Sequence, residues 1–320
     1  MNFKILFRLS LSGLLFLLIL SQMDHQILMK WWQSDHAPEA PLFILSTLFV
    51  MGQIYFLNLR WHAYLNCGTV KIPFKTSVLT NIAGYFANIL FINTIGGMIA
   101  KSGLAVRHGI DLTHAVIATC LDRFMTLFAL MTLSAFGLPF LIHAVDRKIL
   151  GVLSLILFGF AATVFVLLWF YRSGLWDRNQ QEGRHAQMLT TLKKFFTNRN
   201  MMLSTSAHSL IAQALFITSV YALSLGIHGP EGKTLEFLAL LPILALISSL
   251  PVGFGGWGIR ESAFVYGLGL IGYSMEQSFL LSIQVGLVGL IAPFIYGLPY
   301  LLRNDLRDFL GANKPAGKYS

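Results

Sequence analysis

The chain has 320 residues, of which 55% are apolar and only 12% are charged, and its formal net charge is +9. Soluble domains carry about 25% charged residues, so this composition excludes an ordinary soluble protein and indicates a membrane protein. The positive charge is more typical of loops that face anionic lipid headgroups than of a nucleic-acid-binding protein.

Apolar runs follow one another along the chain, and several reach the roughly 20 residues that a membrane-spanning helix needs. The first run begins beside two basic residues, Lys4 before it and Arg8 near its start, as in a signal peptide. No small-residue cleavage site comes after it, so we expect a retained helix. The runs are Ile5–Leu20, Leu42–Leu59, Val78–Ile99, Ala115–Leu141, Ile149–Tyr171, Met201–Ile227, Leu235–Val252, Ser262–Ile271 and Phe279–Leu302.

The basic residues predict the orientation of these segments. With a cytoplasmic N-terminus, the cytoplasmic segments hold two basic residues at the N-terminus, three in 60–77, six in 172–200 and four in the tail, fifteen in all, against four in external segments. This split agrees with the positive-inside rule and places both termini in the cytoplasm. Arg60 is assigned to the 60–77 loop, and the four basic residues left at or within apolar segments are Lys101, Arg107, Arg123 and Arg260.

Counting spans between these loops predicts two hairpins that enter and leave on one side. An even number of segments must cross between 60–77 and 172–200, so Val78–Ile110 returns to its own side. Leu235–Tyr273 breaks into two pieces of about 15 residues, too short to span. We expect an all-α polytopic membrane protein with an inverted repeat of helix, re-entrant hairpin and helix. It would have about six full spans plus the two hairpins; the alternative is eight or nine full spans.

The predicted domain organisation is simple. One integral membrane domain covers 1–302, its halves cover about 42–141 and 201–302, and a short cytoplasmic tail covers 303–320. The linker 172–200 interleaves apolar with basic residues, which predicts an amphipathic helix on the cytoplasmic leaflet or, alternatively, a solvated loop.

Two Gly-Gly pairs mark the halves. Gly96-Gly97 and Gly255-Gly256 are the only such pairs, 159 residues apart, and each is followed four residues later by a basic residue, Lys101 or Arg260. A cation inside an apolar segment is costly, which indicates a functional role; an ion pair between helices or a snorkelling side chain is the structural alternative. The repeated pattern indicates a duplicated unit and favours lipid or solute translocation.

The second glycine element has four glycines in six residues, a density that no regular helix holds. A helix is expected to restart at Ile259 or Arg260, where free N–H groups favour anions and the guanidinium suits a phosphate. Glu261 either pairs with Arg260 or takes part in a proton-coupled step; the structural alternative is a tight turn closed by that pair. The predicted turn residues are Pro251 and Gly253, and the predicted headgroup-binding residues are Gly255, Gly256, Gly258 and Arg260.

In the first element, Asn81 and Asn88 lie seven residues apart on one helix face with Gly84 between them, so this face should meet protein or water. Asp122-Arg123 lies inside an apolar helix, and Glu261 is a candidate partner for Arg123. The predicted headgroup-binding residues here are Asn88, Asn93, Gly96, Gly97 and Lys101; the charge-coupling residues are Glu261, Asp122 and Arg123, and the candidate proton sites are Glu261, Asp122 and Glu276.

The segment Pro251–Glu261 resembles the signature P-x-x-x-G-G-x-G-x-R-E of the transmembrane family of lysylphosphatidylglycerol synthase/flippases and their stand-alone relatives. The family's first-half motif is similar to N-x-x-P-x-x-x-G-E-x-x-R, followed by an acidic-Arg pair in the next helix. Gly96, Gly97, Lys101 and Asp122-Arg123 fit it more loosely, because no proline stands near Asn93, Met98 replaces the acidic residue and lysine replaces arginine. The resemblance covers roughly residues 40–300.

This resemblance implies movement of lipids between the leaflets of a bacterial or archaeal plasma membrane, the inner membrane in a Gram-negative cell. The implied partners are phospholipids or polyprenyl lipids, with a lipid-synthesising enzyme and a second copy as further candidates and no nucleic acid. Only about 18 residues follow Leu302, so we expect no aminoacyl transferase activity. The alternatives are a membrane enzyme acting on lipid phosphates and an accessory subunit of a lipid or glycosyl transferase.

No cofactor or metal is predicted. Cys67 and Cys120 lack metal-type or redox spacing. The sequence has no phosphate-binding loop with Gly-Lys-Ser/Thr, so we expect no ATP hydrolysis. Transport would then be passive, or coupled to protons or to the membrane potential.

Overall fold

The computed structural model describes residues 40–90, 95–172, 192–249 and 258–302, and the regular structure in these ranges is helical. The predicted helix Ile5–Leu20 and most of the linker 172–200 lie outside the described residues. The elements are α3 (Ala40–Leu65), α4 (Phe74–Leu90), α5 (Ile95–Arg107), α6 (Leu112–Gly137) with the 3-10 helix η1 (Leu138–Leu141), α7 (Arg147–Arg172), α9 (Arg199–Leu225), α10 (Thr234–Ser248), α11 (Ile259–Gly269) and α12 (Met275–Leu302).

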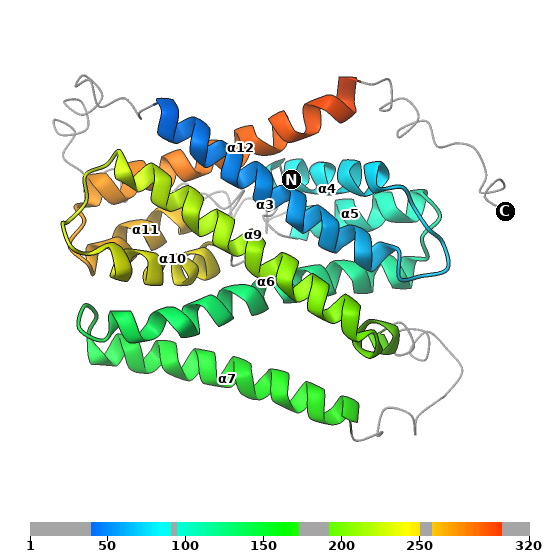
Figure 1. Ribbon diagram of the computed structural model, residues 1–320, viewed down its shortest axis with the longest axis horizontal. Helices are drawn as coiled ribbons and strands as arrows, with labels where there is room; N and C mark the ends of the chain where they lie inside the picture. The colour runs from blue at the N-terminus through cyan, green and yellow to red at the C-terminus, as the bar shows by residue number, and fades with distance from the viewer. Residues whose placement is uncertain (1–39, 91–94, 173–191, 250–257, 303–320) are drawn as a thin grey trace, which may run out of the picture.

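Four helices in the described part of the chain are long and apolar enough to cross a membrane: α3, α6 continued by η1, α9 and α12. In Figure 1, α3 and α9 slope one way across the molecule and α12 slopes the other way. Polar side chains start two of the four helices, because the free N–H groups of a first turn need acceptors. Asp111 accepts from the His114 N–H at 3.2 Å before α6, and Asn198 accepts from the Met201 N–H at 3.1 Å before α9.

The other four helices form two hairpins of short helices. α4 and α5 have 17 and 13 residues, and α10 and α11 have 15 and 11. At 1.5 Å per residue these helices are roughly 16–26 Å long, which is less than the roughly 30 Å of a hydrocarbon core. Figure 1 shows the α4–α5 hairpin in one half of the molecule and the α10–α11 hairpin in the opposite half. The predicted division of Leu235–Tyr273 into two short pieces is therefore confirmed, and Val78–Ile110 likewise contains parts of two helices.

The chain thus contains two similar units, α3 to α6 and α9 to α12. Their first helices, α3 and α9, lie side by side at the front of the view in Figure 1 and pack extensively. Small residues allow this close approach, as is usual between membrane helices. The hydroxyls of Ser46 and Ser219 lie 2.7 Å apart, and a Cβ on Gly52 would come within 3.3 Å of Leu215.

The last helix of each unit packs against the hairpin of the other unit through a glycine. A Cβ on Gly137 of α6 would lie 2.9 Å from the Ala239 carbonyl oxygen of α10, and one on Gly297 of α12 would lie 3.1 Å from Ile82 of α4. These two glycines are 160 residues apart, which matches the offset of the Gly-Gly pairs to within one residue. The same exchange of contacts in both halves is what a duplicated unit produces.

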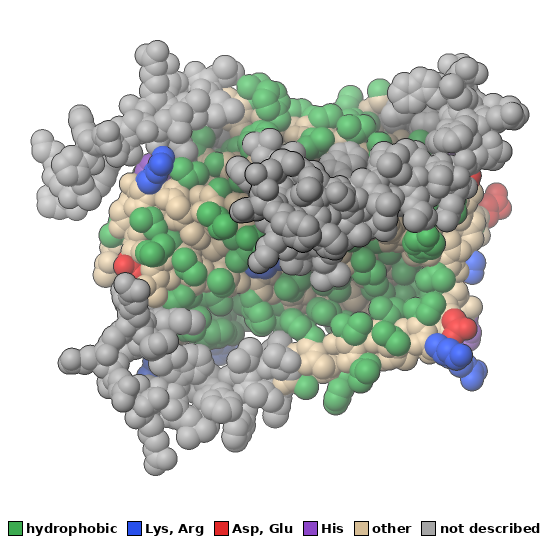
Figure 2. All heavy atoms as spheres, turned by 180° about the vertical axis from the view of Figure 1, so that it is seen from behind, with side chains coloured by type: hydrophobic (Ala, Val, Ile, Leu, Met, Phe, Trp, Pro, Cys, Tyr) green, Lys and Arg blue, Asp and Glu red, His purple; other side chains and the backbone are tan. Residues whose placement is uncertain are grey.

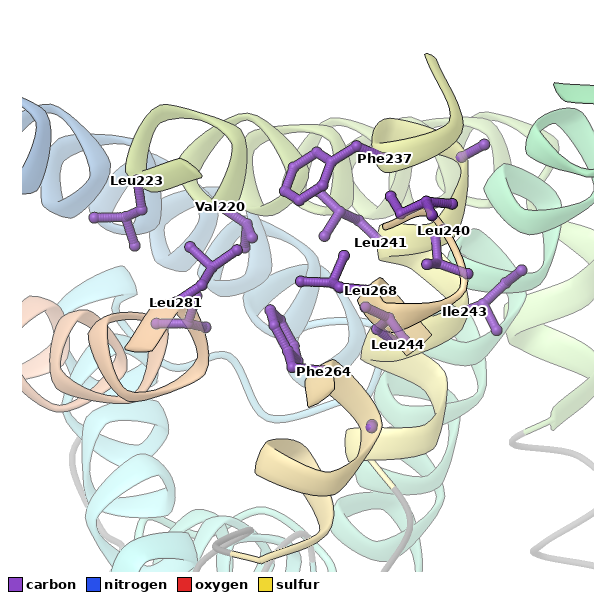
Figure 3. Close-up of a cluster of buried hydrophobic side chains, with 14 of the residues drawn as sticks. Val220, Leu223, Phe237, Leu240, Leu241, Ile243, Leu244, Phe264, Leu268 and Leu281 are labelled. Carbon is purple, nitrogen blue, oxygen red and sulfur yellow. The ribbon is translucent and has the colours of Figure 1, made fainter. Parts of the chain in front are cut away.

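The main hydrophobic core lies where α9, α10, α11 and α12 meet, and its side chains point toward one another in Figure 3. Large apolar side chains also cover the outside: Phe136 of α6 is 74% exposed and Phe158 of α7 is 72% exposed. Figure 2 shows hydrophobic side chains over the middle of one face, with most of the charged ones toward its two ends. This distribution is expected of a protein whose middle contacts lipid.

Candidate functional site

A partly buried carboxylate, Asp122 of α6, is the centre of a three-helix charge cluster. Its Oδ1 accepts from Arg60 Nε of α3 at 2.8 Å and lies 2.7 Å from Arg60 Nη2, and its Oδ2 accepts from Lys101 Nζ of α5 at 3.0 Å. Arg60 also donates to the hydroxyls of Ser209 and Thr126, each at 2.8 Å. The arginine is 1% exposed, and such a charge is tolerated in an apolar interior only when it is paired and hydrogen-bonded.

Arg60 is a site residue that the sequence assigned to a cytoplasmic loop. The structure corrects this, because α3 continues to Leu65 and buries Arg60, Trp61 and Tyr64 together. Two signals were present in the sequence: the aromatic residues after Arg60, and the need of the intramembrane Asp122 for a partner. Arg107 is the opposite case, since it lies in the last turn of α5 and is exposed.

Lys101 contacts residues of three other helices. Its ammonium lies 4.6 Å from the centre of the Trp61 ring, a cation–π contact, and it donates to Asp122. Its aliphatic chain lies against Gly84 of α4, where a Cβ would come within 2.6 Å of Lys101 Cγ. Gly84 therefore provides the space through which Lys101 reaches α6.

An asparagine on the predicted polar face of α4, Asn88, connects α4 to α5. The Asn88 side-chain oxygen accepts from the Gly97 N–H at 2.7 Å, and a Cβ on Gly97 would lie 2.6 Å from the Gly84 carbonyl oxygen. Asn81 donates to Asn58 of α3 at 2.5 Å, and both are buried. The helix face that carries Asn81 and Asn88 therefore meets protein, one of the two predicted surroundings. Gly96 lies in the first turn of α5, and Asn93 lies outside the described residues.

Gly258 is the first described residue of the second glycine element. Its φ of +85° is a conformation that glycine adopts without strain. Helix α11 begins at Ile259, as predicted. The fully buried Glu261 carboxylate accepts from the Gly258 N–H and from Arg260 Nη2, each at 2.5 Å. The turn residues Pro251 and Gly253 and the glycines Gly255 and Gly256 lie outside the described residues.

The Arg260 guanidinium reaches from α11 to α12. A Cβ on Gly286 of α12 would lie 2.7 Å from Arg260 Nη1, so this glycine is what lets the guanidinium sit there. Ser282 lies one turn earlier on α12; it is fully buried, and its hydroxyl has no hydrogen-bond partner in the described part of the chain. A third candidate of the sequence, Glu276, lies in the first turn of α12.

Arg123 connects the first unit to the second hairpin. Its Nη2 donates to the carbonyl oxygen of Ser249, the residue that ends α10, at 2.6 Å. The suggested pairing of Arg123 with Glu261 is therefore wrong: Glu261 is taken by Arg260, its neighbour on α11. Adjacent residues of α6 thus hold both hairpins, since Asp122 binds Lys101 of α5 and Arg123 binds the end of α10.

The charges do not balance in this interior. Four described basic residues (Arg60, Lys101, Arg123 and Arg260) stand against two acidic ones (Asp122 and Glu261), an excess of two positive charges. In the described ranges no cluster of three or more His, Cys, Asp or Glu could hold a metal ion.

Comparison with known proteins agrees with this architecture. The family described as the lysylphosphatidylglycerol synthase TM region matches residues 5–297. No significant match was found among curated proteins or among solved structures. Because the match covers nearly the whole chain, including both hairpins and the charged residues of α6, this protein belongs to the lysylphosphatidylglycerol synthase transmembrane-region family.

Proposed function

We propose that this protein moves a lipid with an anionic or modified headgroup, a phospholipid or a polyprenyl phosphate, between the membrane leaflets. The observation that carries the proposal is the excess of two positive charges around the two hairpins and Asp122-Arg123 of α6. Charge inside a membrane protein is expensive and is usually functional. A phosphate matches both the sign of this charge and the donor fork of arginine.

We propose that Arg260 holds the phosphate between α11 and α12, and that Lys101 and Arg60 provide the equivalent position in the first half. The unpartnered Ser282 hydroxyl supports the first position, because a buried hydroxyl without a partner is costly and a phosphate oxygen would satisfy it. Asp122 and Glu261 would then act as internal counter-ions, each exchanged for the headgroup in turn.

The alternating arrangement of the hairpins supports a translocation path. We propose that α4–α5 is re-entrant from the cytoplasmic side and α10–α11 from the outer side, as in inverted-repeat transporters. Among the described residues, the connections at the α4–α5 end carry more basic residues (Lys71, Lys75, Arg107, Lys193, Lys194 and Arg199) than those at the α10–α11 end (Arg147, Lys148 and Lys233). This asymmetry favours cytoplasmic termini in a bacterial or archaeal plasma membrane.

An apolar groove supports the proposed movement of a lipid. An apolar groove of about 480 Å³ lies between α7 and the α10–α11 hairpin, lined on α11 by Ile259, Ala263 and Tyr266 among others. Tails could remain in this groove while the headgroup stays with the charged residues. We therefore favour translocation over catalysis, since acyl-chain contact and anion binding account for the site without a reacting group.

The test is a leaflet-exchange assay in proteoliposomes with fluorescent phosphatidylglycerol. Arg260→Ala should abolish the exchange that the wild type catalyses. Gly286→Ala should reduce it by about tenfold or more, because the new methyl group takes the place of the guanidinium, at a cost in stability below about 1.5 kcal/mol since a flexible side-chain end can move. Gly289→Ala is the matched control on α12, since a Cβ there meets nothing within 4 Å, and should exchange lipid normally.

Two results would refute the proposal. One is wild-type exchange that is unaffected by Arg260→Ala and Gly286→Ala. The other is the lack of any exchange by the wild type with anionic, aminoacylated and polyprenyl-phosphate lipids in turn.

A further inference from the structure

A small polar pocket lies outside the charged site, at the end of the molecule where α9 turns into α10 and α11 turns into α12. Its volume is about 200 Å³. Both connections lie at the same end of the molecule in Figure 1. The lining residues are Tyr221, Ser224, Leu225, His228, Gly229, Pro230, Thr234, Phe237 and Tyr273.

Three aromatic rings from three elements meet at this pocket. The Phe237 ring centre lies 5.5 Å from that of Tyr273 and 6.4 Å from that of Tyr221. The two ring pairs are tilted by 31° and 52°. Aromatic rings attract cations through their quadrupoles, and recognition of quaternary ammonium groups is a functional use of this contact.

The backbone around the pocket is built to hold the Tyr273 ring. Gly229 lies against the hydroxyl end of that ring, where a Cβ would collide with Tyr273 Cζ, Cε1 and the hydroxyl oxygen. The preceding residue, His228, has a φ of 51°, which is uncommon for a residue other than glycine. Gln277 of α12 fixes this turn by donating to the His228 carbonyl oxygen at 3.1 Å. An uncommon backbone conformation at His228 thus precedes the glycine that leaves room for the Tyr273 ring.

The charge around the pocket also favours a cation. Neither lysine nor arginine is among its described lining residues, and the pocket includes Leu225 at the C-terminal, negative end of α9. The segments that form it, 221–237 and 270–277, contain Glu231, Glu236 and Glu276 against Lys233 alone, a net charge of −2 in a chain of +9. Burial, with a smaller effect from Tyr221, raises the pKa of Tyr273, so the phenol stays neutral at physiological pH.

We propose that this pocket binds a substituted ammonium cation against the rings of Tyr221, Phe237 and Tyr273. The cation would be a free quaternary ammonium ion or the ammonium group of a lipid that reaches this end of the protein. This site is independent of the proposed translocation, because none of the charged residues of α3, α5, α6 or α11 lines it.

The direct test is saturation-transfer NMR on the purified protein in maltoside micelles, with tetramethylammonium chloride as the probe and tert-butanol as a neutral molecule of similar shape. The wild type should show transfer to the ammonium methyl groups and little to tert-butanol. Tyr273→Leu should lower the signal about fivefold or more, since a ring face is lost. Tyr266→Leu is the matched control, because this tyrosine is 59% exposed on α11 and faces the other, apolar groove.

Further variants keep the test decisive if Tyr273→Leu fails to fold. Tyr273→Phe keeps the ring and should keep the signal, whereas Gly229→Ala pushes the ring aside and should lose it. Equal transfer to both probes, or a full signal from folded Gly229→Ala or Tyr273→Leu, would overturn the proposal.

A comparison of nanodiscs identifies the source of the cation. A weaker tetramethylammonium signal in phosphatidylcholine than in phosphatidylglycerol nanodiscs would support a lipid headgroup as the natural ligand. Equal signals would support a soluble ion in the same pocket.

Discussion

Replacing Asp122 by asparagine tests whether the charge cluster of α6 holds the two units together. The substitution keeps the shape of the side chain but removes the negative charge shared by Arg60 and Lys101. The asparagine oxygen can still accept from Arg60, but the amide NH₂ would then face Lys101 Nζ, which is itself a donor. The variant therefore leaves two buried cations without a counter-ion.

The expected cost follows from this geometry. Breaking a buried ion pair by removing one partner costs about 3–5 kcal/mol, because the other charge stays buried and uncompensated. Polar contacts inside membranes average only about 0.6 kcal/mol each, but here the contact to Lys101 is lost together with the negative charge that two cations share. We expect a loss of about 3 kcal/mol in the free energy of unfolding, more than a hundredfold in the unfolding equilibrium.

The assay is reversible unfolding by SDS in mixed micelles, followed by far-UV circular dichroism. Lys101→Met is measured alone and combined with Asp122→Asn, because the double variant removes one orphaned cation. The double variant should be about 1–3 kcal/mol more stable than the sum of the single changes predicts. Asp146→Asn, an exposed loop position, should change the stability by about 0.5 kcal/mol or less.

A loss as small as that of Asp146→Asn would show that Asp122 does not hold the cluster. Strict additivity of Asp122→Asn and Lys101→Met would likewise refute the argued contact between them, whatever the size of each single effect.

Two further predictions concern the first hairpin and the topology. Gly84→Ala should destabilise the protein by about 1–3 kcal/mol, because the new methyl group would collide with the aliphatic chain of Lys101. The control is Gly103→Ala on α5, where a Cβ meets nothing within 4 Å. This variant should be neutral or stabilising in the same SDS titration. An impermeant maleimide should label Glu231→Cys from outside intact cells and native Cys67 only after lysis; labelling of both from one side would contradict the opposed connections. Burial raises the pKa of the Cys67 thiol more than Lys71 and Lys194 lower it, so its labelling rate should keep rising with pH above the range where an ordinary thiol levels off.

The membrane class, the broken segments and the repeat could be predicted from the sequence, because they depend on local properties. Four glycines before Ile259 cannot continue a helix, whatever the surroundings, so the start of α11 followed from the sequence. The 159-residue offset of the Gly-Gly pairs likewise anticipated the two units, and Lys101, Arg260 and Asp122 were recognisable as costly charges in apolar segments.

The partners of these charges were decided only by the tertiary structure. Arg60 meets Asp122 across 62 residues of sequence, and Arg123 meets Ser249 across 126, because the packing and rotation of α3, α6 and α10 bring them together. The predicted segment Leu42–Leu59 ended before Arg60 because a charge there looks costly, whereas Asp122, Ser209 and Thr126 satisfy that charge inside the protein. Gly286 had no distinguishing signal at all, since its role depends on which face of α12 meets Arg260.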